Sequence, residues 1–106
     1  MIDRVSLAAL DATSNDYESA ASVCGELSAF LGEPLSVAEL FAVLRSLEAH
    51  GLVEAYRAGP GSEHLVLAPS SASDLQSSVW FIASAEGRRL LEREWESMFG
   101  GNGAQP

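Results

Sequence analysis

The sequence predicts a mostly helical α+β fold, in which three helices precede a small antiparallel sheet and a further helix closes the domain. Apolar residues recur at helical spacing in three successive segments before residue 51, and short runs rich in β-branched and aromatic residues follow. A chain of 106 residues, 47% of them apolar, is long enough for one compact core and too short for two ordinary domains. We therefore expect one domain over residues 1–99 and a disordered tail over residues 100–106.

The first two helices are predicted from apolar spacing and from the polar residues that separate them. The run Ile2 to Leu10 fits a short helix that ends before the polar cluster Asp11 to Asn15. A second helix is expected from Tyr17 to Leu31, because apolar residues recur there at helical spacing. Its start can be capped by Ser14, Asn15 or Asp16, and its end is set by Gly32 and Pro34.

The third helix has the clearest start in the sequence. Ser36 and Glu39 stand three apart ahead of an apolar-periodic run, which is the arrangement of a capping box. We expect this helix to run from about Val37 to His50 and Gly51 to end it in a left-handed turn. Its outward face is chemically sparse and consists of Ala38, Glu39, Ala42, Arg45, Ser46 and Ala49.

Three short strands and a last helix are predicted after residue 51. The strands are expected at Leu52 to Arg57, Leu65 to Leu67 and Val79 to Ala83, with a turn at residues 59–62. The serine-rich segment Pro69 to Ser78 is predicted to be a mobile loop that contributes little to stability. Ser84 is placed to cap the final helix, which is expected to extend through Phe99.

This order of elements is that of a winged helix-turn-helix domain with an added C-terminal helix. Residues 44–54, LRSLEAHGLVE, resemble the end of the recognition helix and the first sheet strand of PadR-like and MarR-like bacterial transcriptional regulators. Residues 79–91, VWFIASAEGRRLL, are similar to the last wing strand of those proteins and to the start of the helix that follows. The resemblance extends over roughly residues 2–99 and implies a bacterial DNA-binding regulator that acts as a dimer.

The resemblance also implies where DNA would be bound. The third helix would enter the major groove with Ser36 to Ser46 facing base edges, and Arg57 with the wing Gly59 to Ser78 would lie against the backbone. Of these side chains, Arg45 is the one able to make a strong bidentate contact with a base. The implied DNA-binding residues are Ser36, Ala38, Glu39, Ala42, Arg45, Ser46 and Arg57.

The charge balance opposes this function and leaves other interpretations open. Fifteen acidic residues face six basic ones, so the formal net charge is -9, and a field of that sign repels nucleic acid and acidic membranes. We therefore expect modest DNA affinity, and we keep the alternative of an acidic winged helix that contacts a basic protein partner through its small outward face. Arg45 can pair with Glu48 or Glu39 instead of reading a base. The arginines at 57, 88 and 89 form either a phosphate clamp or ordinary solvated surface charge.

The final helix is predicted to pair two copies of the chain. Its large apolar residues exceed what one face of a small monomer usually needs, and helical spacing rotates Leu90 and Phe99 away from the centre of the apolar stripe. The alternative is that the stripe covers the core of its own domain. The predicted dimerisation residues are Leu90, Leu91, Trp95, Met98 and Phe99.

Catalysis, metal binding and membrane insertion are not expected. The chain has no Gly-x-Ser-x-Gly motif, and its two histidines and one cysteine are scattered without metal-ligand spacing, so we expect no enzyme activity, no metal and no cofactor. No segment reaches membrane-spanning length, and the opening run lacks the apolar stretch of a signal peptide. Cys24 is interpreted as a small buried helix residue. Because a single cysteine cannot form an internal disulfide, the cytoplasm is the expected compartment.

Overall fold

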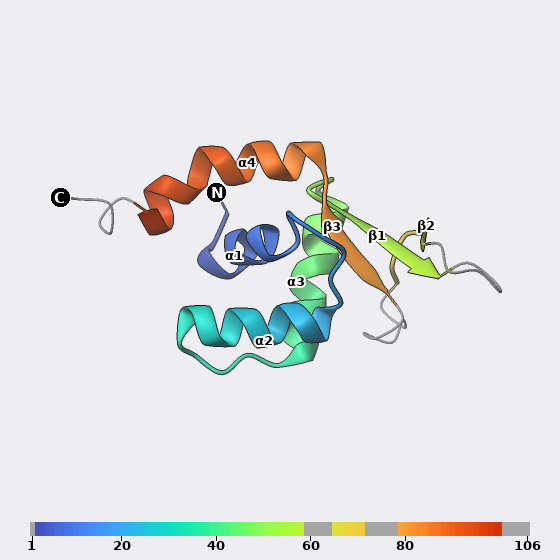
Figure 1. Ribbon diagram of the computed structural model, residues 1–106, viewed down its shortest axis with the longest axis horizontal. Coiled ribbons are helices and arrows are strands. Elements are labelled where there is room, and N and C mark those ends of the chain that lie inside the picture. The colour runs from blue at the N-terminus through green and yellow to red at the C-terminus, as the bar shows by residue number, and fades with distance from the viewer. Residues whose placement is uncertain (1, 59–64, 72–78, 101–106) are drawn as a thin grey trace.

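The computed structural model describes residues 2–58, 65–71 and 79–100. In chain order the elements are α1 (Arg4–Ala12), α2 (Ala20–Leu31), α3 (Val37–Ala49), β1 (Val53–Ala58), β2 (Leu65–Leu67), β3 (Trp80–Ala83), α4 (Ala85–Trp95) and a short π-helical segment, η2 (Glu96–Gly100). This order confirms the predicted fold class, a mostly helical α+β domain of winged-helix form (Figure 1). The predicted turn at residues 59–62, most of the predicted loop (residues 72–78) and residues 101–106 of the tail lie outside the described residues.

Each helix begins at a side chain that satisfies one of its free backbone N–H groups. Asp3, Ser19, Ser36 and Ser84 accept hydrogen bonds from the N–H group three residues further on, which is the geometry of an N-cap. The capping box predicted at the start of α3 is confirmed, since the Glu39 carboxylate also accepts from the Ser36 N–H at 2.9 Å.

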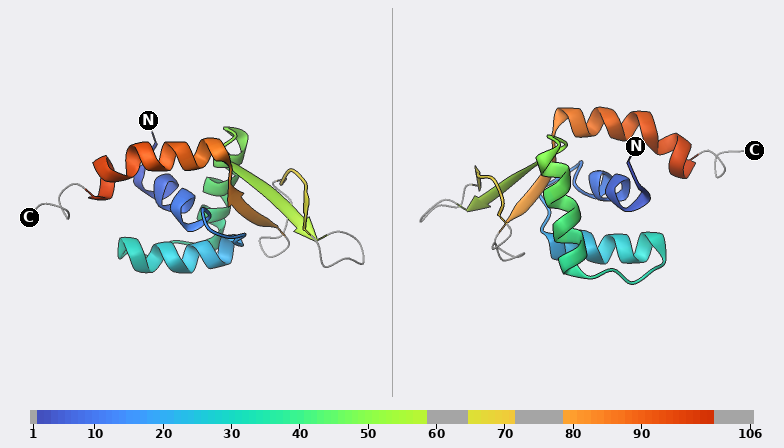
Figure 2. Two further views of the ribbon diagram at one scale, coloured as in Figure 1. Left: turned by 45° about the horizontal axis from the view of Figure 1, so that its top comes forward. Right: turned by 180° about the vertical axis from the view of Figure 1, so that it is seen from behind.

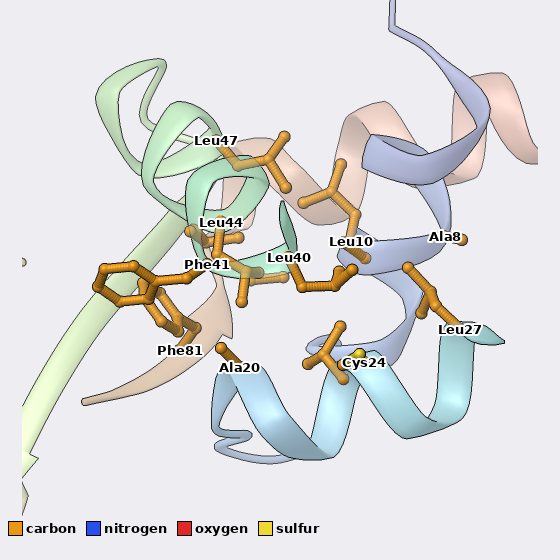
Figure 3. Close-up of a cluster of buried hydrophobic side chains, with 14 of the residues drawn as sticks. Ala8, Leu10, Ala20, Cys24, Leu27, Leu40, Phe41, Leu44, Leu47 and Phe81 are labelled. Carbon is orange, nitrogen blue, oxygen red and sulfur yellow. The ribbon is translucent and has the colours of Figure 1, made fainter. Parts of the chain in front are cut away.

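Helix α1 lies at the centre of the helical body. It runs between α4 and α2, and α3 crosses behind it (Figures 1 and 2). Because neighbours surround it, four consecutive residues from Leu7 to Leu10 are buried, where a surface helix would bury one stripe. Side chains from α2 and α3 converge on it, and Phe81 from β3 packs edge-on against Phe41 at a centroid distance of 6.1 Å (Figure 3).

The turn between α2 and α3 is held to α2 by two side chains. The Cys24 thiol is buried and donates to the Leu35 carbonyl at 3.0 Å, and the Ser28 hydroxyl oxygen accepts from the Leu35 N–H at 3.3 Å. The left-handed conformation at Gly32, with φ of 70°, ends α2 as the sequence predicts. Helices α2 and α3 are therefore fixed to each other through the backbone that connects them.

The sheet is antiparallel with the strand order β2-β1-β3, and it projects from the helical body (Figure 2). Strand β1 is the shared partner: Arg57 faces Val66 in β2, and Val53 faces Ala83 in β3. Its side chains alternate between the two faces of the sheet, so that Val53 and Ala55 are buried and Glu54 is exposed.

Several of the predicted helix boundaries are wrong. Helix α1 begins at Arg4 instead of Ile2 and continues to Ala12, two residues into the polar cluster. Helix α2 starts at Ala20 instead of Tyr17, and its cap is Ser19 and not one of residues 14–16. The later start has a long-range cause, because Glu18 pairs with Phe81 in an antiparallel bridge through hydrogen bonds of 2.8 and 2.9 Å. The bridge holds residue 18 in an extended conformation, and Tyr17 packs edge-on against Tyr56 of β1 at 5.1 Å.

The end of α3 and the start of α4 meet in a tight junction. Gly51 adopts a φ of 75°, and the carbonyls of Gly51 and Leu52 accept from the Ser84 hydroxyl at 2.7 Å and the Ser84 N–H at 3.0 Å. The Ser84 hydroxyl oxygen in turn caps α4 by accepting from the Gly87 N–H. A Cβ at position 87 would stand 2.0 Å from the Leu52 carbonyl oxygen, so this contact requires glycine.

We expect Gly87→Ala to destabilise the protein by about 3 kcal/mol, the upper end of the usual cost of overpacking, because the added methyl collides with a backbone oxygen. The measurement is urea unfolding followed by circular dichroism. Gly25→Ala is the matched control: position 25 lies mid-helix in α2, no described atom comes within 4 Å of an added Cβ, and a gain of about 0.5–1 kcal/mol is expected. Equal stability of the two variants would contradict the close contact of residue 87 with the Leu52 carbonyl.

Candidate functional site

The outward face of α3 is exposed in the way the sequence predicts. Most of its residues are exposed, whereas Arg45 is half-buried. The buried residues of α3 lie on its opposite side, and the edges of the outward face border α1, because Ser46 and Glu39 each line a hollow together with residues of that helix. The exposed members are Ser36, Ala38, Glu39, Ala42, Ser46 and Ala49.

Arg45 is held by a residue that the sequence did not single out. Its Nε donates to the Ser70 hydroxyl oxygen at 3.3 Å. Ser70 itself is bound twice by Glu48, since its N–H donates to Oε2 at 3.0 Å and its hydroxyl donates to Oε1. The predicted pairing of Arg45 with Glu48 is thus indirect, through Ser70. We call Arg45, Glu48 and Ser70 the Ser70 network.

The Ser70 network changes the interpretation of the segment after β2. Residues 69–71 are described, and Ser70 is fixed to α3 while the Ala68 N–H continues the β1–β2 ladder by donating to Ala55 at 2.9 Å. The expectation that Pro69 to Ser78 is a mobile loop is therefore wrong at Ser70, which is bound to α3. The sequence carries no local signal for this contact, because Glu48 and Ser70 lie 22 residues apart.

The remaining arginines of the predicted DNA surface lie on the sheet and on α4. Arg57 is half-buried on β1, at the start of the wing. Arg88 donates from Nε to the Ser14 carbonyl at 3.3 Å, and Arg89 forms an ion pair with Glu86 on the same helix. These two α4 arginines therefore have acceptors within the chain.

The predicted dimerisation residues pack against the core of their own chain. All five residues, Leu90, Leu91, Trp95, Met98 and Phe99, are half-buried, so the expectation that Leu90 and Phe99 would stand in water without a second chain is wrong. For Phe99 the reason is Phe30 at the end of α2, whose ring lies 5.3 Å from that of Phe99 and 5.8 Å from that of Trp95. Leu90 instead lines the space between α1, α3 and α4 together with Ile2 and Leu47. Phe30 itself is 55% exposed and was missed, because nothing local to it marks this meeting of α2 and α4.

A hollow of about 640 Å³ lies between α1, α3 and α4. His50, the C-cap of α3, stands on its wall and donates from Nδ1 to the Ser46 carbonyl at 2.8 Å. The rest of the wall combines apolar side chains with charged ones and consists of Ile2, Asp3, Ser6, Ser46, Leu47, Leu52, Leu90, Arg93 and Glu94.

Comparison with known proteins adds no relative to this description: no protein-family model and no curated protein matches the chain. Within residues 2–58, 65–71 and 79–100, no three histidine, cysteine or carboxylate side chains gather closely enough to hold a metal ion. In the same part of the chain, no helix has both the length and the apolar character needed to cross a membrane.

The carboxylate of Glu39 gives the start of α3 a pH dependence. The hydrogen bonds from Ser36 lower the pKa of Glu39 in the folded state. The resulting stabilisation is fully present above the ordinary glutamate pKa and is lost as the pH falls through the lowered pKa. In urea unfolding measured across acidic pH, we expect Glu39→Gln to remove this dependence. The difference in free energy of unfolding between the wild type and this variant should therefore shrink toward low pH.

The comparison variant for this measurement is Ser36→Ala. It removes the hydroxyl that accepts from the Glu39 N–H and should cost about 1 kcal/mol at neutral pH, since an N-cap is lost. A Glu39→Gln difference that stays constant from neutral to acidic pH would show that the carboxylate does not stabilise the helix start.

Proposed function

We propose that the chain is a winged-helix transcriptional regulator that binds DNA, with α3 in the major groove and the wing against the backbone. The observation that carries the proposal is the outward face of α3, on which Ser36, Ala38 and Ala42 are exposed and Arg45 is bound by Ser70 of the segment that leaves β2. The PadR-like and MarR-like sequence resemblance supports the same assignment. A single soluble domain with one cysteine, buried in α2, fits the cytoplasm, where such regulators act.

The side chains on this face suit shallow, close contact with base edges. The methyl groups of Ala38 and Ala42 can pack against thymine methyl groups, and the hydroxyls of Ser36 and Ser46 can exchange hydrogen bonds with bases or phosphates. Arg45 supplies the strong contact, because a guanidinium matches the two acceptors of guanine. Glu39 can accept from cytosine while its other oxygen stays in the capping box.

The charge of the chain sets the strength of this binding. Phosphate contacts supply most of the salt-dependent affinity of DNA-binding proteins, and a net charge of -9 works against them. We therefore propose modest affinity that is confined to low salt and depends on few contacts.

A homodimer would raise that affinity by engaging two half-sites about one DNA turn apart. We propose that the apolar surface of α4 and η2 pairs two copies, with Phe30 added to the residues that the sequence indicates. Phe30 supports this surface because it is more than half exposed while its ring packs on Trp95 and Phe99. Two copies of this charge repel each other, so the pairing should be tighter in salt.

A second function is favoured by the same outward face. Its alanines, at positions 38, 42 and 49, let another helix approach closely, and the carboxylates of Glu39 and Glu48 beside them complement a basic partner. In this second proposal the domain contacts a basic protein and does not bind DNA. The two functions differ in one measurable respect, which is whether any duplex is shifted at low salt.

The test of DNA binding is an electrophoretic shift of the DNA upstream of the protein's own coding sequence, at low and moderate salt. Arg45→Ala should lose sequence preference: the difference in binding free energy between the preferred and a substituted base pair at the contacted position should fall by about 1–3 kcal/mol. Arg57→Ala should weaken all duplexes alike and flatten the dependence on salt by about one unit of slope. Unchanged specificity in Arg45→Ala would refute the placement of α3 in the groove, and no shift of any duplex would favour the protein partner.

Sedimentation over a concentration series tests the dimer. The wild type should associate at micromolar concentrations and moderate salt, whereas Phe30→Ser should remain monomeric with little loss of stability, because this ring is largely exposed already. The double variant Trp95→Ala with Phe99→Ser should also stay monomeric, with a larger loss of stability from its half-buried rings. A wild type that is monomeric at high micromolar concentration would exclude this dimer.

A further inference from the structure

The Ser70 network joins the two parts of the proposed DNA surface. Arg45 and Glu48 belong to α3, whereas Ser70 belongs to the segment that leaves β2, so the contact spans 22 to 25 residues of sequence. Both polar groups of Ser70 point at the same carboxylate of Glu48. This double contact fixes the position of the Ser70 hydroxyl relative to the helix.

The direction of the hydrogen bonds determines what Arg45 meets. Because the Ser70 hydroxyl gives its proton to Glu48, its oxygen presents lone pairs to Arg45 and accepts from Nε at 3.3 Å. A hydroxyl that donates to a carboxylate is polarised and becomes a better acceptor. The chain of hydrogen bonds therefore runs from Arg45 through Ser70 to Glu48.

This arrangement restricts a side chain that is otherwise free to adopt many rotamers. Arginine loses considerable conformational entropy when it is ordered, so an arginine that is fixed before binding spends less of its binding energy on ordering. The hydrogen bond uses the Nε–H group and leaves the N–H groups of both terminal nitrogens for other acceptors. Those terminal groups are the ones that can approach a base as a fork.

We propose that Ser70 and Glu48 are positioning residues for sequence recognition, which fix Arg45 at the junction of α3 and the wing. The inference rests on the proposed DNA-binding function and deepens it, because it assigns specificity to a wing residue and to a glutamate that themselves need not touch DNA. Ser70 and Glu48 act through Arg45, so their contribution disappears when Arg45 is absent.

The first arm of the test needs no DNA. Exchange of the Arg45 Nε–H proton with water is measured by NMR in the wild type and in Ser70→Ala, Glu48→Ala and Ser97→Ala. The first two variants should speed this exchange severalfold, because each breaks the hydrogen-bond chain. The control is Ser97→Ala, because Ser97 is exposed and belongs to η2, which lies at the opposite end of the domain from the sheet (Figure 1). This variant should leave the exchange rate of the Arg45 Nε–H unchanged. Equal exchange in Ser70→Ala and the wild type overturns the proposal whatever the DNA result.

The second arm measures the ratio of affinities for a duplex selected from a randomised pool and for an unrelated duplex, at low salt. Ser70→Ala should lower this ratio severalfold and leave the affinity for the unrelated duplex unchanged. In the Arg45→Ala background the same substitution should have no further effect, since residues that act as a unit are not additive. If Ser70→Ala lowers the affinity ratio by the same factor in the wild type and in the Arg45→Ala background, Ser70 does not act through Arg45 and the positioning role is overturned.

The two arms separate the failure of this inference from the failure of the proposed function. If the wild type binds all duplexes equally, the protein does not recognise a sequence, and Ser70 and Glu48 have no role in recognition. The exchange measurement still reports whether these two residues hold Arg45 in place. A wild type with sequence preference and Arg45 exchange insensitive to Ser70→Ala refutes the positioning role alone.

Discussion

The carbonyl groups of Gly51 and Leu52 must find donors where α3 ends, and Ser84 supplies both of them. With one N–H and one hydroxyl it ties the last turn of α3 to the first turn of α4, and the absence of a side chain at Gly87 lets the two backbones touch. The sheet leaves and re-enters the helical body at this point. Together with the Glu18–Phe81 bridge and the Ser70 network, these contacts hold β1 and β3, and hence the wing, in a defined orientation relative to α3.

Affinity and specificity come from different parts of this surface. Phosphate contacts position a protein on DNA without reading its sequence, and base contacts read the sequence. The chain is poor in the cations that make the first kind of contact, so its proposed DNA binding depends on shape, on the fixed geometry of Arg45 and on pairing through α4. In the second proposal, the same scarcity of cations would favour a basic protein over DNA at the small outward face of α3.

What the sequence predicts correctly is mostly local. The caps at Ser36 and Ser84 act on N–H groups three residues away, and both are confirmed together with the helices that they begin. The predicted start of α2 was wrong because Glu18 forms a β-bridge with Phe81, 63 positions further on. No sequence pattern around residue 18 indicates that bridge. Ser70 and Phe30 were missed for the same reason. The outward face of α3 was found because helical periodicity alone places it.

The buried thiol of Cys24 gives the helix-turn-helix unit a built-in chemical reporter. Its hydrogen bond to the Leu35 carbonyl lies between α2 and the turn that leads to α3, so a thiol reagent can reach the sulfur when these parts separate. Since the chain has one cysteine, the rate of labelling under native conditions measures the opening of this unit and not that of the sheet or of α4. When labelling is faster than reclosing, this rate gives the lifetime of the closed helix-turn-helix unit in the unmodified sequence.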